Sequence, residues 1–218
     1  MKDATGDRER GAKSVSGGLF PVTDSQLIRE IKDGNVELYS VLIERYEKKI
    51  LAFIYNMLKS ARLEAITEDL CQETFYKAYR SLNTFREVEA AFSTWLYTIA
   101  RNTVLSELRK QKAINVSLDD YSYDLKAPSE TAPENTILRN EKVRMVREAI
   151  NKLPEKQRSA LILREYNQLD YQEIAAILGQ TVSSVKSLLF RARASVRNHL
   201  EPYYVDTIYE GYEGMNHR

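Results

Sequence analysis

Apolar residues recur at helical spacing in four stretches of the N-terminal half of the chain. The first stretch begins with a capping box formed by Thr23 and Gln26 and ends at Gly34. The second has the stripe Leu38, Leu42, Tyr46, Ile50, Phe53, Ile54 and Met57. The third, which Thr67 is expected to cap, has Leu70, Phe75, Ala78, Tyr79 and Leu82, and the fourth, from about 91 to 111, has Trp95, Leu96, Ile99, Val104 and Leu108. This pattern predicts one four-helix domain over residues 23–112.

The helical pattern stops in a polar, acidic segment and then returns. We interpret residues 113–135 as a flexible linker and residues 136–200 as a second helical domain. Residues 1–22 have the polar composition of a disordered leader, and residues 201–218 form an acidic, tyrosine-rich tail. The predicted fold class is all-α, with two small helical domains joined by the linker.

Residues 171–193 predict a helix, a tight turn and a second helix. Gly179 can end the first helix in the left-handed conformation, and Thr181 can cap the second through its hydroxyl. Between residues 180 and 200 there are four basic residues and no acidic one. Such a helix suits the major groove of DNA, with cations near the phosphates. An ordinary amphipathic hairpin with a basic face is the competing interpretation.

The net charge of +1 hides a strong segregation of charge along the chain. Residues 141–200 carry eleven basic and six acidic side chains, whereas residues 113–140 and 201–218 each have a net charge of −3. A basic block between two acidic segments points to nucleic acid as the partner of the block.

The chain offers little material for catalysis or metal binding. Its single cysteine, Cys71, excludes an internal disulfide, and its histidines are limited to His199 and His217. We therefore expect no cofactor and no enzymatic activity. No apolar run approaches the ~18 residues of a membrane helix, so we also expect a cytoplasmic protein without membrane insertion.

Two blocks of sequence resemble the sigma factors of bacterial RNA polymerase, in particular the small group IV or extracytoplasmic-function (ECF) class. The first block comprises EDLCQETFYKAYRSLNTF at 68–85 and FSTWLYTIARN at 92–102. The second runs from LPEKQR to VRNHL, at 153–200. Primary sigma factors carry a further domain between these blocks, where this chain has a linker alone. The pairing of the two blocks is highly specific and covers most of residues 24–200.

The resemblance implies that the chain binds core RNA polymerase (its β′ and β subunits), and that the first block contacts the β′ subunit. The family motif Asp/Glu-Asp-x-x-Gln-Glu-x-Phe corresponds here to Glu68, Asp69, Gln72, Glu73 and Phe75, of which Asp69, Gln72, Glu73 and Phe75 are the implied polymerase-binding residues. The three polar residues share one helix face because they are spaced i, i+3, i+4. Taken alone they favour a solvated acidic face, and the resemblance reverses that preference. A metal or catalytic site is a third interpretation, weakened because no histidine joins them.

The resemblance also implies a surface for the minus-ten promoter element. The implied residues are Arg86, Glu87, Val88 and Glu89 in a loop and Tyr97, Arg101, Asn102, Arg109 and Lys110 on the following helix. In the family this loop captures a flipped base, and flipping costs a few kcal/mol that a polar, stacking pocket can offset. The loop lacks the usual glycine and is one residue longer. Phe85 and Phe92 fit the core equally well, Trp95 is favoured as core, and Tyr97 is expected to be more exposed.

The second block is implied to read the minus-35 element. The implied residues are Thr181, Ser183, Ser184, Lys186, Ser187, Phe190, Arg191 and Arg193. Lys186 stands where many relatives have arginine, and lysine lacks the planar fork that grips guanine, so we expect weaker base discrimination there. Phe190 is equally compatible with the core.

Together these features imply an ECF sigma factor that binds core polymerase, recognises both promoter elements and promotes transcription initiation. An anti-sigma factor is a further implied partner. A stand-alone helix-turn-helix transcriptional regulator is the alternative, and the acidic face of Asp69, Gln72 and Glu73 distinguishes the two. An enzyme acting on nucleic acid is disfavoured because no nucleophile or metal-ligand cluster is evident.

Overall fold

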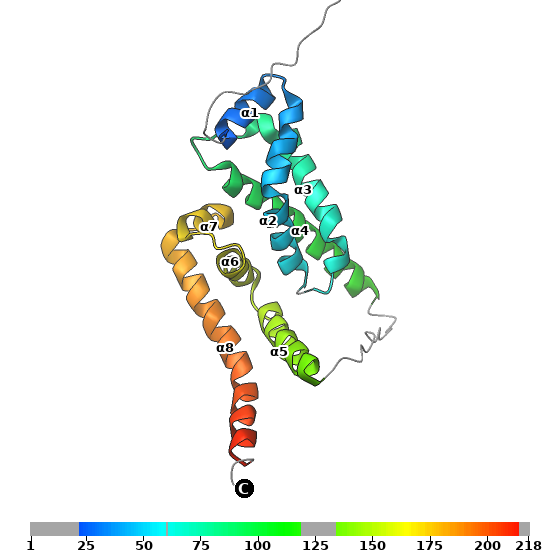
Figure 1. Cartoon of the computed structure of the whole chain (residues 1–218), viewed down its shortest axis with the longest axis vertical. Coiled ribbons are helices and arrows are strands. Elements are labelled where there is room, and N and C mark those ends of the chain that lie inside the picture. Colours follow the sequence, from blue (N-terminus) through cyan, green and yellow to red (C-terminus); the bar gives the residue numbers. More distant parts are fainter. Residues whose placement is uncertain (1–21, 60, 119–133, 214–218) are drawn as a thin grey trace, which may run out of the picture.

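The computed structural model describes residues 22–59, 61–118 and 134–213, and within them it contains α-helices, short 3₁₀ turns and no β-strand (Figure 1). The helices are α1 (Asp24–Lys32), α2 (Tyr39–Lys59), α3 (Thr67–Ser81), α4 (Phe92–Leu118), α5 (Glu134–Asn151), α6 (Glu155–Glu165), α7 (Tyr171–Leu178) and α8 (Val182–Glu213). The 3₁₀ turns are η1 (Val36–Leu38), η2 (Glu64–Ile66) and η3 (Leu82–Thr84). Most of the expected leader and linker lies outside the described residues. None of the described helices is long and apolar enough to cross a membrane.

Helix α2 is the centre of the N-terminal domain. Its predicted stripe is buried, with Leu42, Ile50 and Phe53 fully shielded from solvent, because α1, α3 and α4 pack around it. Each buried aliphatic or aromatic side chain contributes roughly 1.5–3 kcal/mol by leaving water. The spacing of apolar residues that predicted the helices therefore also determines which helix faces pack against each other.

The ends of α1 follow the sequence prediction. Thr23 accepts a hydrogen bond from the Gln26 backbone N–H, and the Gln26 side chain accepts one from the Thr23 N–H at 2.9 Å, which completes the capping box. The helix ends at Lys32, and Gly34 follows with a φ of 111°, a conformation that glycine adopts without steric cost.

The start of α3 differs from the prediction. Thr67 is the first residue of the helix and not its cap, because η2 runs directly into the helix. The Thr67 hydroxyl donates to the Glu64 carbonyl oxygen at 2.7 Å. Tyr79, expected in the apolar stripe, is 40% exposed, and the centre of its ring lies 5.0 Å from the centre of the Tyr39 ring. Helix α4 continues to Leu118, into the segment expected as linker.

The C-terminal domain consists of α5 to α8. Pro154 precedes α6 as its N-cap. Gly179 adopts the left-handed conformation with a φ of 58°, and Thr181 accepts from the Ser184 backbone N–H at 3.2 Å, both as predicted. Helix α8 continues through Pro202 to Glu213, so its backbone extends well past the expected domain end at residue 200.

The two domains pack against each other. Helices α6 and α7 lie against α2 and α4 (Figure 1). The buried Ser159 hydroxyl lies 3.9 Å from the sulfur of Met57, and the Asn167 side chain donates to the Lys49 carbonyl oxygen at 3.3 Å. One cluster of buried apolar side chains includes residues of both domains, so the fold joins them in a common core.

Candidate functional site

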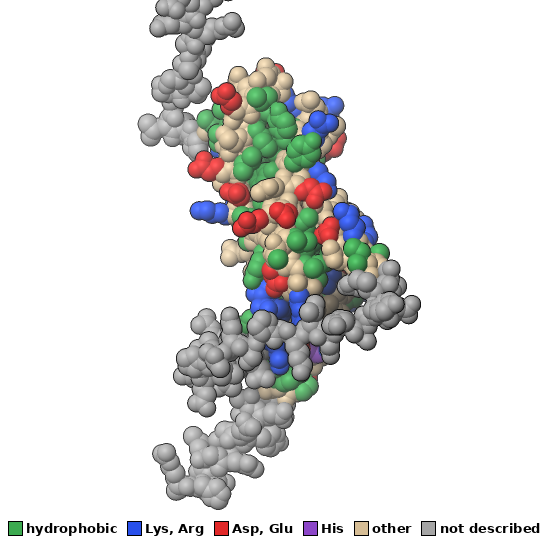
Figure 2. Space-filling view, turned by 90° about the vertical axis from the view of Figure 1, so that its right-hand side faces the viewer, with side chains coloured by type: hydrophobic (Ala, Val, Ile, Leu, Met, Phe, Trp, Pro, Cys, Tyr) green, Lys and Arg blue, Asp and Glu red, His purple; other side chains and the backbone are tan. Residues whose placement is uncertain are grey.

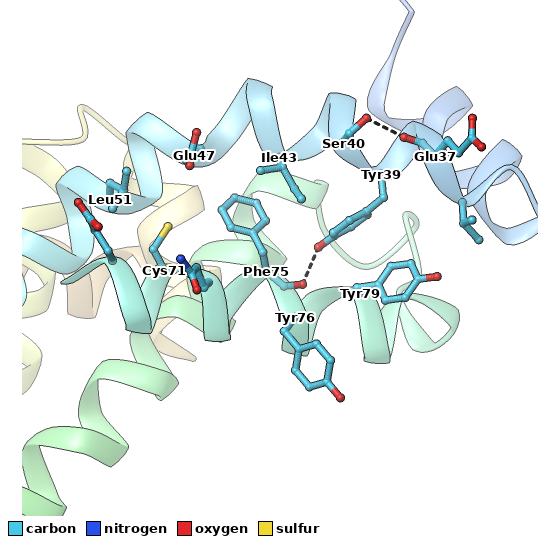
Figure 3. A pocket seen from close by; sticks show the side chains of 13 residues that line it. Glu37, Tyr39, Ser40, Ile43, Glu47, Leu51, Cys71, Phe75, Tyr76 and Tyr79 are labelled. Carbon is cyan, nitrogen blue, oxygen red and sulfur yellow. Dashed lines mark hydrogen bonds between the residues drawn. The ribbon is translucent and has the colours of Figure 1, made fainter. Parts of the chain in front are cut away.

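A groove of about 820 Å³ lies between α2 and α3 (Figure 3). Its lining combines buried apolar side chains such as Cys71 and Phe75 with exposed carboxylates, among them Glu47 and Glu68. Burial raises the pKa of the Cys71 thiol to about 11, so this side chain stays protonated and apolar in character. The groove offers an apolar floor with negative charge beside it.

The acidic face predicted from the sequence lies on α3, and Gln72 is the member of its polar residues that lines this groove. Asp69 and Gln72 are exposed. Glu73 is half-buried and forms an ion pair of 2.7 Å with Lys77. Phe75 is buried, and its carbonyl oxygen accepts a hydrogen bond of 2.7 Å from the Tyr39 hydroxyl, whose pKa is raised by burial (Figure 3). Phe75 is thus part of the groove floor, Gln72 lines the groove with it, and Asp69 and Glu73 belong to the same helix.

The upper half of the face seen in Figure 2 carries a patch of apolar side chains with acidic ones around it, and basic side chains lie at its right-hand edge and farther down. This distribution matches a surface that can bind an apolar segment flanked by cations. Attraction between such charges speeds association and selects partners of opposite sign.

The loop between η3 and α4 projects from a rigid aromatic base. Phe85 and Phe92 are buried, and their rings lie 5.8 Å apart; the Trp95 ring lies 5.1 Å from that of Phe85. A backbone hydrogen bond of 3.1 Å from the Glu89 N–H to the Arg86 carbonyl closes a turn. Within that turn Val88 is 96% exposed. The three aromatic residues therefore support the loop, and the four predicted minus-ten residues of the loop are accessible.

Two of the predicted minus-ten residues on α4 are engaged by the other domain. Tyr97 is 2% exposed, contrary to the expectation that it is open, and its hydroxyl accepts a 3.2 Å hydrogen bond from Asn167. Arg101 is also largely covered and pairs with Glu155 at 2.6 Å. The remaining members of the set, Asn102, Arg109 and Lys110, are exposed.

The helix-turn-helix presents one face of α8 to solvent. Val185, Leu189 and Ala192 are buried against the domain core. The predicted minus-35 residues Thr181, Ser183, Lys186, Ser187, Phe190, Arg191 and Arg193 are exposed, and Ser184 is partly buried. Phe190 is 75% exposed, so it is a surface residue and not part of the core. The first turns of α8 are thus free for contacts with base edges and phosphates.

Several residues at these surfaces have no signal in the sequence. Glu165 on α6 accepts two hydrogen bonds from Arg193, the shorter of 2.7 Å, and Glu155 and Asn167 form hydrogen bonds with Arg101 and Tyr97 of α4. Each is distant in sequence from its partner, so only the tertiary fold reveals it. Arg197 is different, because it follows Arg193 by one helical turn and lines the same shallow pocket on α8.

Within the part of the chain that the structure describes, no group of three or more His, Cys, Asp or Glu side chains is placed to hold a metal ion. The accessible surfaces are instead suited to binding macromolecules, an acidic groove in one domain and a basic helix face in the other.

Comparison with known proteins decides the family. Residues 42–114 match the family Sigma-70 region 2, and residues 144–196 match Sigma-70, region 4. The RNA polymerase sigma-H factor of Pseudomonas aeruginosa is 37% identical over 186 residues, which cover 82% of this chain and 94% of the relative. The ECF RNA polymerase sigma-E factor of Haemophilus influenzae is 33% identical over 188 residues, covering 83% and 97%. The chain belongs to the ECF sigma factors.

Two solved structures share the fold of this sigma factor. They are the sigma factor RpoE with the anti-sigma factor NepR from Bartonella quintana, and CnrH with the cytosolic domain of CnrY. Each has a TM-score of 0.57, with 24% and 23% identity; the matches cover 75% and 81% of this chain and 96% of each solved chain.

As a sigma factor, the protein binds core RNA polymerase, recognises minus-35 and minus-ten promoter elements and promotes transcription initiation. The presence of both regions disfavours the stand-alone regulator, because such a regulator does not need region 2.

Proposed function

We propose that this sigma factor divides its contacts among three surfaces. The α2–α3 groove with Asp69, Gln72 and Glu73 binds the β′ subunit of core polymerase. The loop at 86–89 and α4 read the minus-ten element, and α8 reads the minus-35 element. The observation that carries this assignment is the exposed basic and aromatic face of α8, opposite its buried Val185 and Leu189.

The groove supports the first contact through its chemistry. Exposed carboxylates and the Gln72 amide can bind basic side chains of a partner helix by charge-assisted hydrogen bonds. The apolar floor supplies buried area at the centre of the contact, where it contributes most to affinity. We therefore assign the same groove to the β′ subunit, with the β subunit contacted elsewhere on the chain.

The exposed loop supports the second contact. A base that leaves the DNA stack needs polar and apolar partners held in place. Val88 and the charged residues beside it are accessible, whereas Phe85 and Phe92 are committed to the core. On α4, Asn102, Arg109 and Lys110 are available at once, and Tyr97 and Arg101 require that α6 and α7 move away.

The domain boundaries follow from these surfaces. We propose a region 2 domain over 23–112, a linker over 113–135 and a region 4 domain over 136–200, with α4 and α8 extending past the two domain ends. The protein contributes binding free energy and performs no covalent chemistry. It works in the cytoplasm, where the polymerase and the chromosome are.

An anti-sigma factor is a further proposed partner. RpoE and CnrH, which share the fold, were solved in complex with an anti-sigma factor and with the cytosolic domain of CnrY, respectively. Co-purification of this chain with proteins from its own cells, followed by inhibition of transcription by the captured protein, tests the proposal.

Run-off transcription with core polymerase on a random promoter library tests the function directly. We expect enrichment of two short sequence elements at a fixed spacing when the sigma factor is present. Transcripts that are independent of the added chain, or enrichment of only one element, would contradict the assignment.

A further inference from the structure

Helix α1 contacts the loop between η3 and α4 at two points, although α1 lies more than fifty residues before this loop in the sequence. The Ser25 hydroxyl donates a hydrogen bond to Glu87 in the turn. The Lys32 ammonium donates to the Phe85 carbonyl oxygen at 3.0 Å and lies 5.9 Å from the centre of the Phe85 ring. The two contacts come from the first and last turns of α1, so they hold both the stem and the turn of the loop.

Helix α1 is itself fixed to the body of the domain. Asp24 pairs with Arg45 and accepts a hydrogen bond from the Tyr46 hydroxyl, both on α2. Arg45 also donates to the Val22 carbonyl oxygen at 2.9 Å. The Tyr46 ring packs edge-on at 5.6 Å against Phe92, where the loop enters α4. Because α1 is fixed to α2, and Tyr46 of α2 packs against Phe92 at the start of α4, the contacts from α1 fix the loop relative to both α2 and α4.

We propose that Ser25 and Lys32 are positioning residues for the minus-ten loop, and that Glu87 acts through Ser25 and not by direct contact with the base. This inference rests on the proposed function of the loop. Glu87 is tied back to α1, whereas Val88, next in the turn, is almost fully exposed. Val88, with Arg86 and Glu89, is then the part of the loop presented to DNA.

A loop without glycine makes such bracing useful. The segment from 86 to 91 contains no glycine, and a pocket for a flipped base works only when its groups are held in place. Fixing the turn before DNA arrives removes part of the ordering cost of binding. The expected effect of losing the brace is thus weaker capture at one base position and not a general loss of promoter binding.

The test uses holoenzyme, formed with core polymerase, and a DNA library randomised across the minus-ten element. Ser25→Ala and Lys32→Met should each weaken binding of the preferred sequence about fivefold, the usual effect of one lost hydrogen bond. The base preference should flatten at a single minus-ten position, while the minus-35 preference remains. Arg29→Met, also exposed on α1, is the matched control and should select the wild-type sequence.

A double-mutant cycle separates positioning from direct contact. If Glu87 acts through Ser25, then Glu87→Ala should cause the same loss as Ser25→Ala, and the double variant should lose no more. Additive losses would mean that Glu87 contacts the base itself and would overturn the inference.

The remaining outcomes are also decisive. Unchanged selection by both α1 variants overturns the inference alone. A uniform loss at all minus-ten and minus-35 positions with a lower unfolding temperature also overturns it, because it shows a purely structural role. A wild-type holoenzyme that enriches no minus-ten sequence overturns the proposed function, and the inference with it.

Discussion

Arg101 on α4 and Glu155 on α6 form an ion pair between the two domains, with 2.6 Å between Nη2 and Oε1. Glu155 also accepts a hydrogen bond of 2.9 Å from the buried Ser159 hydroxyl, which fixes its carboxylate. The Arg101 side chain is 12% exposed, so water screens this pair less than it screens an ion pair on the open surface. A residue that the family resemblance assigns to the minus-ten element is therefore occupied by the other domain.

Replacing Glu155 should free Arg101. Glu155→Gln removes a charge-assisted contact of about 1.5–3 kcal/mol and should raise the affinity of the free chain for single-stranded minus-ten DNA severalfold. Fluorescence anisotropy with a labelled oligonucleotide measures this. Glu148→Gln, whose side chain on α5 is 47% exposed and pairs with Arg144 of the same helix, is the control and should leave the affinity unchanged. Equal affinity of both variants and wild type would show that the pair does not limit DNA binding.

Alkaline pH should loosen the contact at Tyr97. Burial raises the pKa of this phenol to about 12 from an ordinary value of 10.0, helped by the Glu173 charge and opposed by the Asn167 hydrogen bond. The unfolded chain ionises first, so the contribution of Tyr97 to stability is complete below pH 10 and is lost as the pH rises toward 12. Urea unfolding at a series of pH values measures it.

Two tyrosine variants separate the effect of Tyr97 on stability from the effects of other groups that titrate at high pH. Tyr97→Phe should reduce the loss of stability between pH 10 and 12. Tyr76→Phe, whose ring is exposed, should retain the wild-type profile. Identical profiles for wild type and Tyr97→Phe would be inconsistent with the buried environment of Tyr97.

Charge reversal on α3 should block assembly with polymerase. Asp69→Lys places a cation where a basic partner is expected and removes a charge-assisted contact, so binding to core polymerase should fall at least tenfold. Titration of labelled chain with core polymerase measures the affinity, and circular dichroism checks the fold. Glu201→Lys, an exposed residue of α8, makes the same change of charge away from the groove and should bind normally.

Lys186→Arg should sharpen reading of the minus-35 element. Arginine offers a planar fork that grips guanine at two acceptors, and a good bidentate contact is worth about 1–3 kcal/mol of discrimination. Selection from a library randomised at the minus-35 element should show a stronger guanine preference at one position. Lys156→Arg, exposed on α6, should not change the selected sequence.

Local chemistry made much of the fold predictable. The capping box at Thr23 and the left-handed Gly179 depend on residues that are neighbours in the sequence, and both are confirmed. The prediction that Thr67 caps α3 is wrong, because the 3₁₀ turn η2 before it changes where the helix begins. That turn has no strong signature in the sequence.

The site was less predictable where the second domain covers the first. Tyr97 was expected to be open, but its ring packs edge-on at 5.5 Å against Phe53, and its hydroxyl accepts a hydrogen bond from Asn167, a residue seventy positions away on the approach to α7. Phe190 could not be assigned from periodicity alone, because its place on α8 adjoins both the buried and the exposed face. Tertiary packing, which buries Tyr97 and leaves Phe190 exposed, decided both residues.

The contact between the two domains buries polar atoms without giving them hydrogen-bond partners. Among the described residues, Nε of Arg101 and Oδ1 of Asn167 are buried without a hydrogen-bond partner, and each such atom costs about 1–3 kcal/mol. These costs offset part of what the ion pair and apolar contacts contribute to holding the domains together. On the proposed minus-ten role of Tyr97 and Arg101, the apparent affinity for promoter DNA is the intrinsic affinity multiplied by the fraction of molecules whose domains are apart. Any partner that holds the domains apart therefore raises the promoter affinity without touching DNA.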